Sequence, residues 1–279
     1  MKKLSPKLDF EDKSVKLTGY LPRGKEKPVI IVLPGGGYEV CAKNEGEPVA
    51  KAFAKLGFAA FTLHYSVLRG KRFGKNEHTL FPEPLREVAL TIKHIRNNAE
   101  EYGIDSNKIA LFGASAGGHL AATYANMWNS PYVYDGIETP SRIRVNGCVL
   151  LYGATDTTIN TTLLSAIYGK EEFTDEEKSR FVAKDAVSED TPPTVLFHSV
   201  NDPIVPVQES LELFAALQQR GIPTELHLFG SGGHAYGLGE KTPLDGWQKL
   251  AANFLNGVWN TPEQYDKANI ADAMRKIFG

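Results

Sequence analysis

The sequence predicts an α/β fold, in which a mostly parallel central sheet is flanked by helices. Short runs rich in β-branched and aromatic residues alternate with longer segments whose apolar residues recur at helical spacing. Such alternation is typical of a parallel sheet, because each helix carries the chain back to the same edge. A chain of 279 residues can bury a substantial core, and we expect residues 1–279 to form a single domain.

The first predicted strand, residues 28–33, is continuously apolar, as a strand buried on both faces should be. A helix over residues 49–56 follows, and Gly57 ends it. Residues 58–63 form the next predicted strand. A long helix then begins near Pro84, because apolar residues return at three- and four-residue intervals.

The second half of the chain continues this alternation. Residues 108–112 form a predicted strand that runs into a glycine-rich turn. The remaining predicted strands cover residues 145–151, 194–198 and 224–229, and predicted helices near residues 207–217 and 244–255 separate or follow them.

Three stretches depart from the alternation. Residues 66–82 are a polar loop, which we interpret as a solvated connection. Residues 153–192 are charged and weakly helical, and we expect them to form a small cap insert above the sheet, after the sixth strand of the fold. We expect the C-terminal tail, residues 261–279, to form a helix that packs on the body of the protein or on a second subunit of a homo-oligomer.

Composition favours a small neutral ligand. The net charge is −2, and no cluster of lysine and arginine marks a surface for nucleic acid or for a membrane. Pro6 and Asp9 interrupt the N-terminus before any apolar segment of signal-peptide length, so we expect a cytoplasmic protein. Two cysteines, Cys41 and Cys148, are too few for a disulfide framework or a structural zinc site.

The glycine-rich turn carries the candidate nucleophile. Ser115 lies between Gly113 and Gly117, directly after the predicted strand 108–112. This G-x-S-x-G pattern is typical of a sharp strand-to-helix turn that exposes a serine hydroxyl, and glycine is needed where the backbone must pass closely. The pattern predicts that Ser115 projects from the edge of the sheet.

A nucleophilic serine needs a histidine to take its proton. We predict that His234 is this base, because it lies in a glycine-dense loop, residues 230–237, directly after a strand. We expect His94 and His227 to be structural, and His119 to point along the side of the helix that follows Ser115. His198 ends a strand near the acid and His64 follows a strand beside the glycine loop, so lining the site is an alternative role for each. His78 has no supporting context.

The base needs a carboxylate to orient it, and this turn type places serine, acid and histidine in that chain order. We predict that Asp202 is the acid, because it follows the strand 194–198 and precedes a helix. The alternative interpretation of Asp202 is a turn aspartate. The competing acid is Asp156, which follows the preceding strand.

Three consecutive glycines, residues 35–37, follow the first buried strand. Their backbone can aim N–H groups at one point, which an oxyanion requires. We predict that Gly36 and Gly37 donate from this loop and that Ala116 donates from the other side. Tyr38 is a candidate substrate-binding residue in the pocket wall, with packing against the sheet as its alternative role. A phosphate-binding loop fits poorly, because no lysine and serine or threonine follow the glycines.

Together, these motifs resemble the α/β-hydrolase superfamily of serine esterases. Within it, the chain is similar to the bacterial acetyl-esterase and feruloyl-esterase-like group related to the hormone-sensitive-lipase branch. The resemblance spans about residues 28–255 and is carried by residues 34–38, 81–85, 102–105, 113–120, 201–206 and 232–234. Two departures from the lipase branch are Pro34, where that branch has histidine, and too short a segment before Val15 for an N-terminal cap.

The resemblance implies a carboxylic ester hydrolase that removes acetyl groups from plant-polysaccharide fragments such as xylo-oligosaccharides. The expected partner is a small ester substrate, and the expected mechanism uses neither a metal nor an organic cofactor. Two alternatives stay open. One is a peptidase or amidase of the prolyl-oligopeptidase type, and the other is a non-catalytic ligand-binding protein on the same fold.

Overall fold

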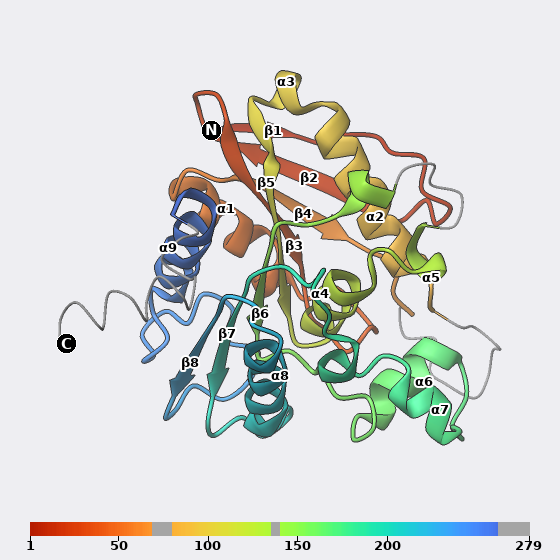
Figure 1. Cartoon of the computed structure of the whole chain (residues 1–279). Coiled ribbons are helices and arrows are strands. Elements are labelled where there is room, and N and C mark those ends of the chain that lie inside the picture. Colours follow the sequence, from red (N-terminus) through yellow and green to blue (C-terminus); the bar gives the residue numbers. More distant parts are fainter. Residues whose placement is uncertain (69–79, 135–139, 262–279) are drawn as a thin grey trace.

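The computed structural model describes residues 1–68, 80–134 and 140–261. Their strands form one eight-stranded sheet in the order β1-β2-β4-β3-β5-β6-β7-β8 (Figure 1). The strands are β1 (Lys2–Leu4), β2 (Lys16–Leu21), β3 (Lys27–Leu33), β4 (Ala59–His64), β5 (Ile104–Ala114), β6 (Gly147–Leu151), β7 (Thr194–Ser199) and β8 (Thr224–Phe229). The strands from β4 through β3 to β8 pair in parallel. The predicted mostly parallel sheet is confirmed.

The sheet also holds two strands that the sequence analysis did not predict. β1 pairs with β2, and β2 pairs with β4, both antiparallel. β5 is longer than the predicted strand 108–112, since it begins at Ile104. β1 and β2 extend the sheet beyond β4.

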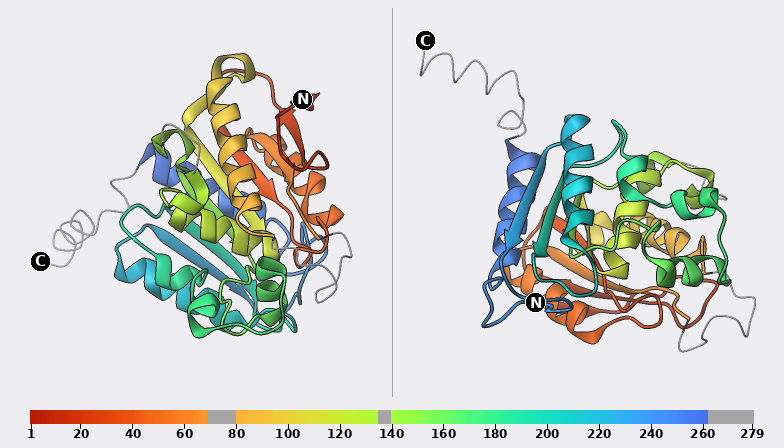
Figure 2. Two further views of the ribbon diagram at one scale, coloured as in Figure 1. Left: turned by 90° about the vertical axis from the view of Figure 1, so that its right-hand side faces the viewer. Right: turned by 90° about the horizontal axis from the view of Figure 1, so that it is seen from below.

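Helices cover both faces of the sheet. They are α1 (Glu47–Lys55), α2 (Glu83–Asn97), α3 (Ala99–Tyr102), α4 (Ala116–Met127), α5 (Pro131–Tyr134), α6 (Thr161–Tyr168), α7 (Asp175–Ser179), α8 (Val207–Gln219) and α9 (Trp247–Asn260), with short 3₁₀ helices η1 (Lys43–Glu45), η2 (Pro140–Ile143) and η3 (Ala183–Ala186). α1 and α9 pack on one face, and α2, α4 and α8 pack on the other (Figures 1 and 2). The chain is therefore a three-layer α/β/α structure.

Alternate side chains of one strand divide the core between the two faces. In β3, Ile31 and Leu33 belong to the cluster under α2 and α4, and Ile30 and Val32 belong to the cluster under α1 and α9. All four side chains are fully buried, which explains why this strand reads as continuously apolar.

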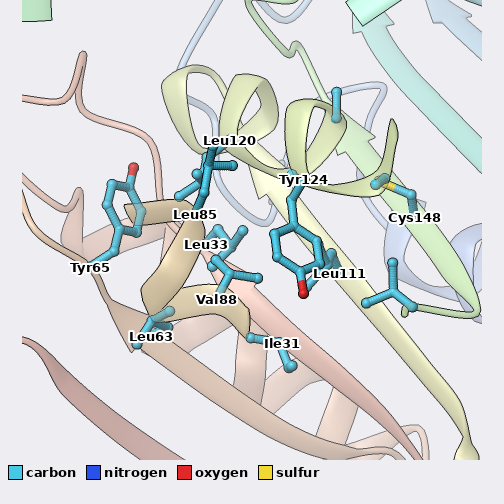
Figure 3. Close-up of a cluster of buried hydrophobic side chains, with 14 of the residues drawn as sticks. Ile31, Leu33, Leu63, Tyr65, Leu85, Val88, Leu111, Leu120, Tyr124 and Cys148 are labelled. Atoms are coloured by element: carbon cyan, nitrogen blue, oxygen red, sulfur yellow. The ribbon is translucent and has the colours of Figure 1, made fainter. Parts of the chain in front are cut away.

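Figure 3 shows the first of these two clusters. Leu85 and Val88 of α2, with Leu120 and Tyr124 of α4, pack over the sheet at Leu111. The Tyr124 hydroxyl donates a hydrogen bond to a backbone carbonyl 2.7 Å away, so its polar end is also satisfied. α4, the helix that follows Ser115, is therefore anchored along its length.

The carboxyl ends of β3, β5, β6, β7 and β8 lie at one edge, because these strands are parallel neighbours. Ligand sites of open α/β sheets form at this edge. The predicted insert, residues 153–192, contains α6, α7 and η3. The predicted tail beyond Thr261 and most of the predicted polar loop, residues 69–79, lie outside the described residues.

Candidate active site

The turn between β5 and α4 places Ser115 at the strand edge. Its backbone has a positive φ of 51° with a ψ of −121°, a strained conformation that residues other than glycine rarely adopt. A β-carbon on Gly113 would lie 2.2 Å from the carbonyl oxygen of Gly117, and one on Gly117 would lie 2.1 Å from that of Leu33. Both contacts are impossible for a real side chain, so close backbone approach requires the two glycines.

The structure brings Ser115, His234 and Asp202 together. Nε2 of His234 lies 2.9 Å from the Ser115 Oγ, and Nδ1 lies 2.7 Å from Oδ2 of Asp202. The carboxylate can only accept, so Nδ1 carries the imidazole proton and Nε2 is free to accept from the serine hydroxyl. The side chain of Asp202 is fully buried, and that of His234 is 11% exposed.

Asp202 is held as a carboxylate. Burial raises the pKa of this carboxyl, but hydrogen bonds from His198, His234 and the amides of Val205 and Ile204 outweigh burial and hold it below its usual range. Nε2 of His198 lies 3.3 Å from Oδ2 of Asp202. The acid therefore keeps the negative charge that an imidazolium at His234 needs.

The competing acid, Asp156, is engaged elsewhere. One carboxylate oxygen accepts from the amide of Thr158 at 2.9 Å, and the other lies 3.0 Å from Nζ of Lys184. Among the described contacts, the carboxylate at His234 is that of Asp202.

The glycine loop after β3 lies next to Ser115, and its last glycine, Gly37, borders open space. Gly36 and Gly37 have φ values of 119° and 62°. A β-carbon on Gly36 would clash with a carbonyl oxygen 2.1 Å away, and one on Gly37 would meet nothing within 4 Å. Among the hydrogen bonds of the described residues, none uses the amides of Gly36 or Gly37. Ala116 opens α4, where an N–H has no acceptor within its helix.

The structure does not place Tyr38 in the wall of an open pocket, which was its predicted position as a substrate-binding residue. Its side chain has no exposed surface, and its hydroxyl lies 2.7 Å from Nδ1 of His119. Burial raises the pKa of the Tyr38 hydroxyl well above its ordinary value. The ring packs edge-on against Tyr65 and Phe81. Tyr38 therefore packs in the core next to the glycine loop, which is the packing role named as its alternative.

The other described histidines are not members of the group formed by Ser115, His234 and Asp202. His119 is fully buried, and burial lowers its pKa to about 4. His94 bonds a tyrosine and His227 bonds a glutamate. His64 ends β4 and is partly buried. His78 lies outside the described residues.

α9 holds the loop that carries His234. The indole N–H of Trp247 donates to the backbone carbonyl of Gly237 at 3.0 Å. The side-chain amide of Gln248 donates to the backbone carbonyl of Leu238, also at 3.0 Å. Trp247 is fully buried. The position of the candidate base therefore depends on a helix that lies after it in the chain.

Sequence reasoning missed three residues that hold the site. Glu45 and Tyr152 are buried and hydrogen-bonded to each other, and Asn201 accepts from the amide of Gly233 at 3.0 Å. Glu45 lies in a charged segment, which is typical of a solvated surface. Only the tertiary structure buries it, and no pattern in the sequence indicates this.

In residues 1–68, 80–134 and 140–261, no helix is long and apolar enough to cross a membrane. No group of three or more histidine, cysteine, aspartate or glutamate side chains in these ranges could hold a metal ion.

Two relatives of this chain carry names that refer to xylan. Endo-1,4-beta-xylanase B of Butyrivibrio fibrisolvens is 30% identical over 228 residues, which are 80% of this chain and 34% of that protein. The acetylxylan esterase of Xylanibacter ruminicola is 26% identical over 257 residues, which are 90% of this chain and 48% of that protein. The chain thus spans less than half the length of either relative.

A solved structure matches over most of both chains. The acetyl ester-xyloside bifunctional hydrolase from Caldicellulosiruptor lactoaceticus superposes with a TM-score of 0.75 at 31% identity, covering 88% of this chain and 88% of that one. A family model described as BD-FAE matches residues 17–217, more than half of the chain. The chain therefore belongs to the BD-FAE family and has the α/β-hydrolase fold.

Proposed function

We propose that the protein is a serine carboxylesterase that hydrolyses short acyl esters, above all acetyl esters of sugars such as xylo-oligosaccharides. One observation carries the esterase proposal: a single imidazole, that of His234, bridges the Ser115 hydroxyl and a buried carboxylate. This arrangement activates a serine for acyl transfer. Family membership supports the same chemistry.

In the first half of the proposed reaction, the Ser115 Oγ attacks the ester carbonyl carbon while Nε2 of His234 takes the hydroxyl proton. Asp202 stabilises the resulting imidazolium. The amides of Gly36, Gly37 and Ala116 donate to the oxyanion of the tetrahedral intermediate. The bond to the alcohol oxygen then breaks, and the alcohol leaves with the proton from His234.

In the second half, water replaces the alcohol. His234 takes a proton from the water, whose oxygen attacks the acyl carbon and forms a second tetrahedral intermediate. The bond to the Ser115 Oγ breaks, His234 returns the proton to that oxygen, and the carboxylic acid leaves. Each proton moves through one histidine, so the mechanism needs no metal and no organic cofactor.

The acyl preference is inferred from the size of the segments near the site. The insert between β6 and β7 contributes two short helices, α6 and α7. We infer that they form the lid over the acyl side of the site, where so small a lid would shelter a short acyl chain. One matched protein is named an acetylxylan esterase and another an acetyl ester-xyloside bifunctional hydrolase. These names favour acetyl as the acyl group and a sugar as the alcohol.

The test measures kcat/KM on para-nitrophenyl esters of increasing acyl length, beside acetate release from acetylated xylo-oligosaccharides. We expect kcat/KM to fall at least about tenfold from acetyl to octanoyl, a difference of about 1.4 kcal/mol. A profile that peaks at octanoyl, or no acetate from any acetylated sugar, refutes the acetyl-sugar proposal while leaving the esterase intact.

A matched ester and amide pair and a serine-directed phosphonate separate the remaining functions. An esterase cleaves the ester far faster than the amide, and the phosphonate labels Ser115. Faster cleavage of the amide supports a peptidase, and no labelling supports a non-catalytic binding protein. Ser115→Ala is the control for both measurements.

A further inference from the structure

We propose that Glu45 is a positioning residue that fixes the oxyanion loop and the histidine loop relative to each other through one buried carboxylate. The inference rests on the proposed esterase function and adds a residue to its machinery. Glu45 is 1% exposed and lies in η1, between the glycine loop and α1. Its two oxygens contact two different parts of the site.

One oxygen holds the oxyanion loop. Oε2 accepts a hydrogen bond from the amide of Gly35 at 2.8 Å. A β-carbon on Gly35 would lie 2.5 Å from this oxygen and 2.9 Å from Cβ of Ser115, so carboxylate, loop and nucleophile are packed in contact. Gly35 is covalently joined to Gly36, a candidate oxyanion donor. A displaced Gly35 therefore displaces that donor.

The other oxygen holds Tyr152, the residue that follows β6. The Tyr152 hydroxyl donates to Oε1 of Glu45 at 2.6 Å and accepts from the amide of Gly237 at 3.3 Å. The Tyr152 ring lies against the His234 imidazole, with centroids 4.6 Å apart. Burial raises the pKa of Tyr152 well above its ordinary value, so the hydroxyl keeps the proton that it donates.

A second contact joins the same short helix to the histidine loop. The side-chain amide of Asn44 donates to the carbonyl of Ala235 at 2.8 Å. Gly237 approaches η1 so closely that a β-carbon there would lie 2.8 Å from the carbonyl oxygen of Asn44. η1 thus contacts the loops on both sides of Ser115.

The chemistry of these contacts requires a carboxylate. Glu45 faces two donors, an amide and a hydroxyl, and only a carboxylate offers an acceptor oxygen to each. A glutamine would turn its NH₂ toward the Tyr152 hydroxyl or toward the Gly35 amide. One of the two buried donors would lose its acceptor, and the two loops would no longer be held by the same side chain.

The test uses Glu45→Gln, Tyr152→Phe and the double variant, assayed on para-nitrophenyl acetate. We expect each single variant to lower kcat by about 10- to 100-fold with KM changed less than about twofold, because misalignment acts on the transition state. The double variant should be no slower than the slower single one, since both changes break one path. A trifluoromethyl ketone, whose adduct places an oxyanion at the site, should bind more weakly by a similar factor.

Glu87→Gln is the matched control. Glu87 is also buried, and it also accepts from one backbone amide and one hydroxyl, both of Ser66. It should keep kcat within about twofold of wild type. An equal kcat loss in Glu87→Gln, a wild-type kcat in the folded Glu45 and Tyr152 variants, or losses that multiply in the double variant would each overturn the inference.

Two further measurements make the result decisive. Circular dichroism and thermal unfolding identify variants that are folded at the assay temperature. If Glu45→Gln does not fold, the kcat of Tyr152→Phe, which loses only a hydroxyl, decides. Ser115→Ala separates the two proposals: if wild type and Ser115→Ala hydrolyse the ester equally, the esterase proposal fails, whereas an inactive Ser115→Ala beside a fully active Glu45→Gln refutes only the role of Glu45.

Discussion

In the proposed mechanism, Ser115 and His234 act only as a pair, because the hydroxyl is a weak nucleophile until the imidazole takes its proton. We expect Ser115→Ala to lower kcat for acetyl esters by about 10³-fold or more, and His234→Ala to do the same. The double variant should lose little beyond either single one. Steady-state kinetics on folded proteins check this, and near-wild-type kcat in either variant would show that the nucleophile or the base lies elsewhere.

The two candidate acids give a matched pair of variants. Asp202→Asn removes the charge that stabilises the imidazolium and replaces an acceptor of Nδ1–H with an amide that favours the wrong tautomer, so we expect kcat to fall by about 10³- to 10⁴-fold. Asp156→Asn changes a carboxylate bonded to Lys184 and should leave kcat within a few-fold. The reverse ranking would mean that the acid is Asp156.

The sequence predicts site residues well where the backbone itself is unusual. Ser115, Asp202 and His234 all lie in glycine- or proline-rich turns directly after strands, and the structure brings them together. Tyr38 and Glu45 show where prediction stops. Tyr38, predicted as a candidate pocket wall, is buried, and Glu45, for which the sequence analysis made no prediction, is buried too, because tertiary contacts decide both.

At the scale of elements, the turn between β5 and α4 depends on glycine because two backbones approach there. A β-carbon at residue 117 meets backbone, which cannot move aside as a flexible side chain can. We therefore expect Gly117→Ala to lower the melting temperature and to lower kcat in the protein that remains folded. Thermal unfolding and kinetics on the same sample measure both effects.

Gly230→Ala is the control for this substitution. A β-carbon at Gly230 would meet nothing within 4 Å, and its φ lies outside the left-handed region. It should leave the melting temperature nearly unchanged. If Gly117→Ala is as stable and as active as Gly230→Ala, the close approach at the turn does not constrain the protein.

Prediction of elements succeeded from β3 to β8 and failed at the edge of the sheet formed by β1 and β2. β3 to β8 are signalled by apolar runs between turns, whereas β2 contains Gly19, which weakens any strand signal. Gly19 pairs with Phe61 across the sheet, and a β-carbon there would lie 2.8 Å from the Phe61 ring. The partner strand supplies the packing that this residue lacks, and that information is not local.

At the scale of the whole molecule, two buried carboxyls contribute to a decrease in the free energy of unfolding as pH rises. Burial raises the pKa of Glu209 to about 7, with the charge of Asp156 adding to the shift and that of Lys184 opposing it. Burial likewise raises the pKa of Glu87 to about 7. A carboxyl whose pKa is higher in the folded state stabilises the fold below its unfolded pKa and loses that contribution as pH rises through its folded pKa.

We therefore expect each carboxyl to lower the melting temperature as pH rises between about pH 5 and pH 8, whereas His119, whose pKa burial lowers to about 4, acts in the opposite direction below about pH 6.5. Glu209→Gln cannot ionise and should flatten the decline, as should Glu87→Gln. Thermal unfolding across this range gives the slopes. Variants whose slopes equal that of wild type would show that neither carboxyl has a raised pKa in the folded protein.

The hydrogen bonds from α9 to the loop that carries His234 affect both the folding and the unfolding of the candidate active site. Since Trp247 and Gln248 fix the loop from a later point in the chain, a nascent chain that has already paired β3 to β8 still lacks an aligned base until α9 has docked. In reverse, we expect release of α9 alone to remove two hydrogen bonds from the loop that carries His234, and so to misalign His234 relative to Ser115 while the sheet persists. On heating, loss of hydrolysis should therefore precede loss of secondary structure, and catalytic turnover becomes a reporter of whether one helix has docked.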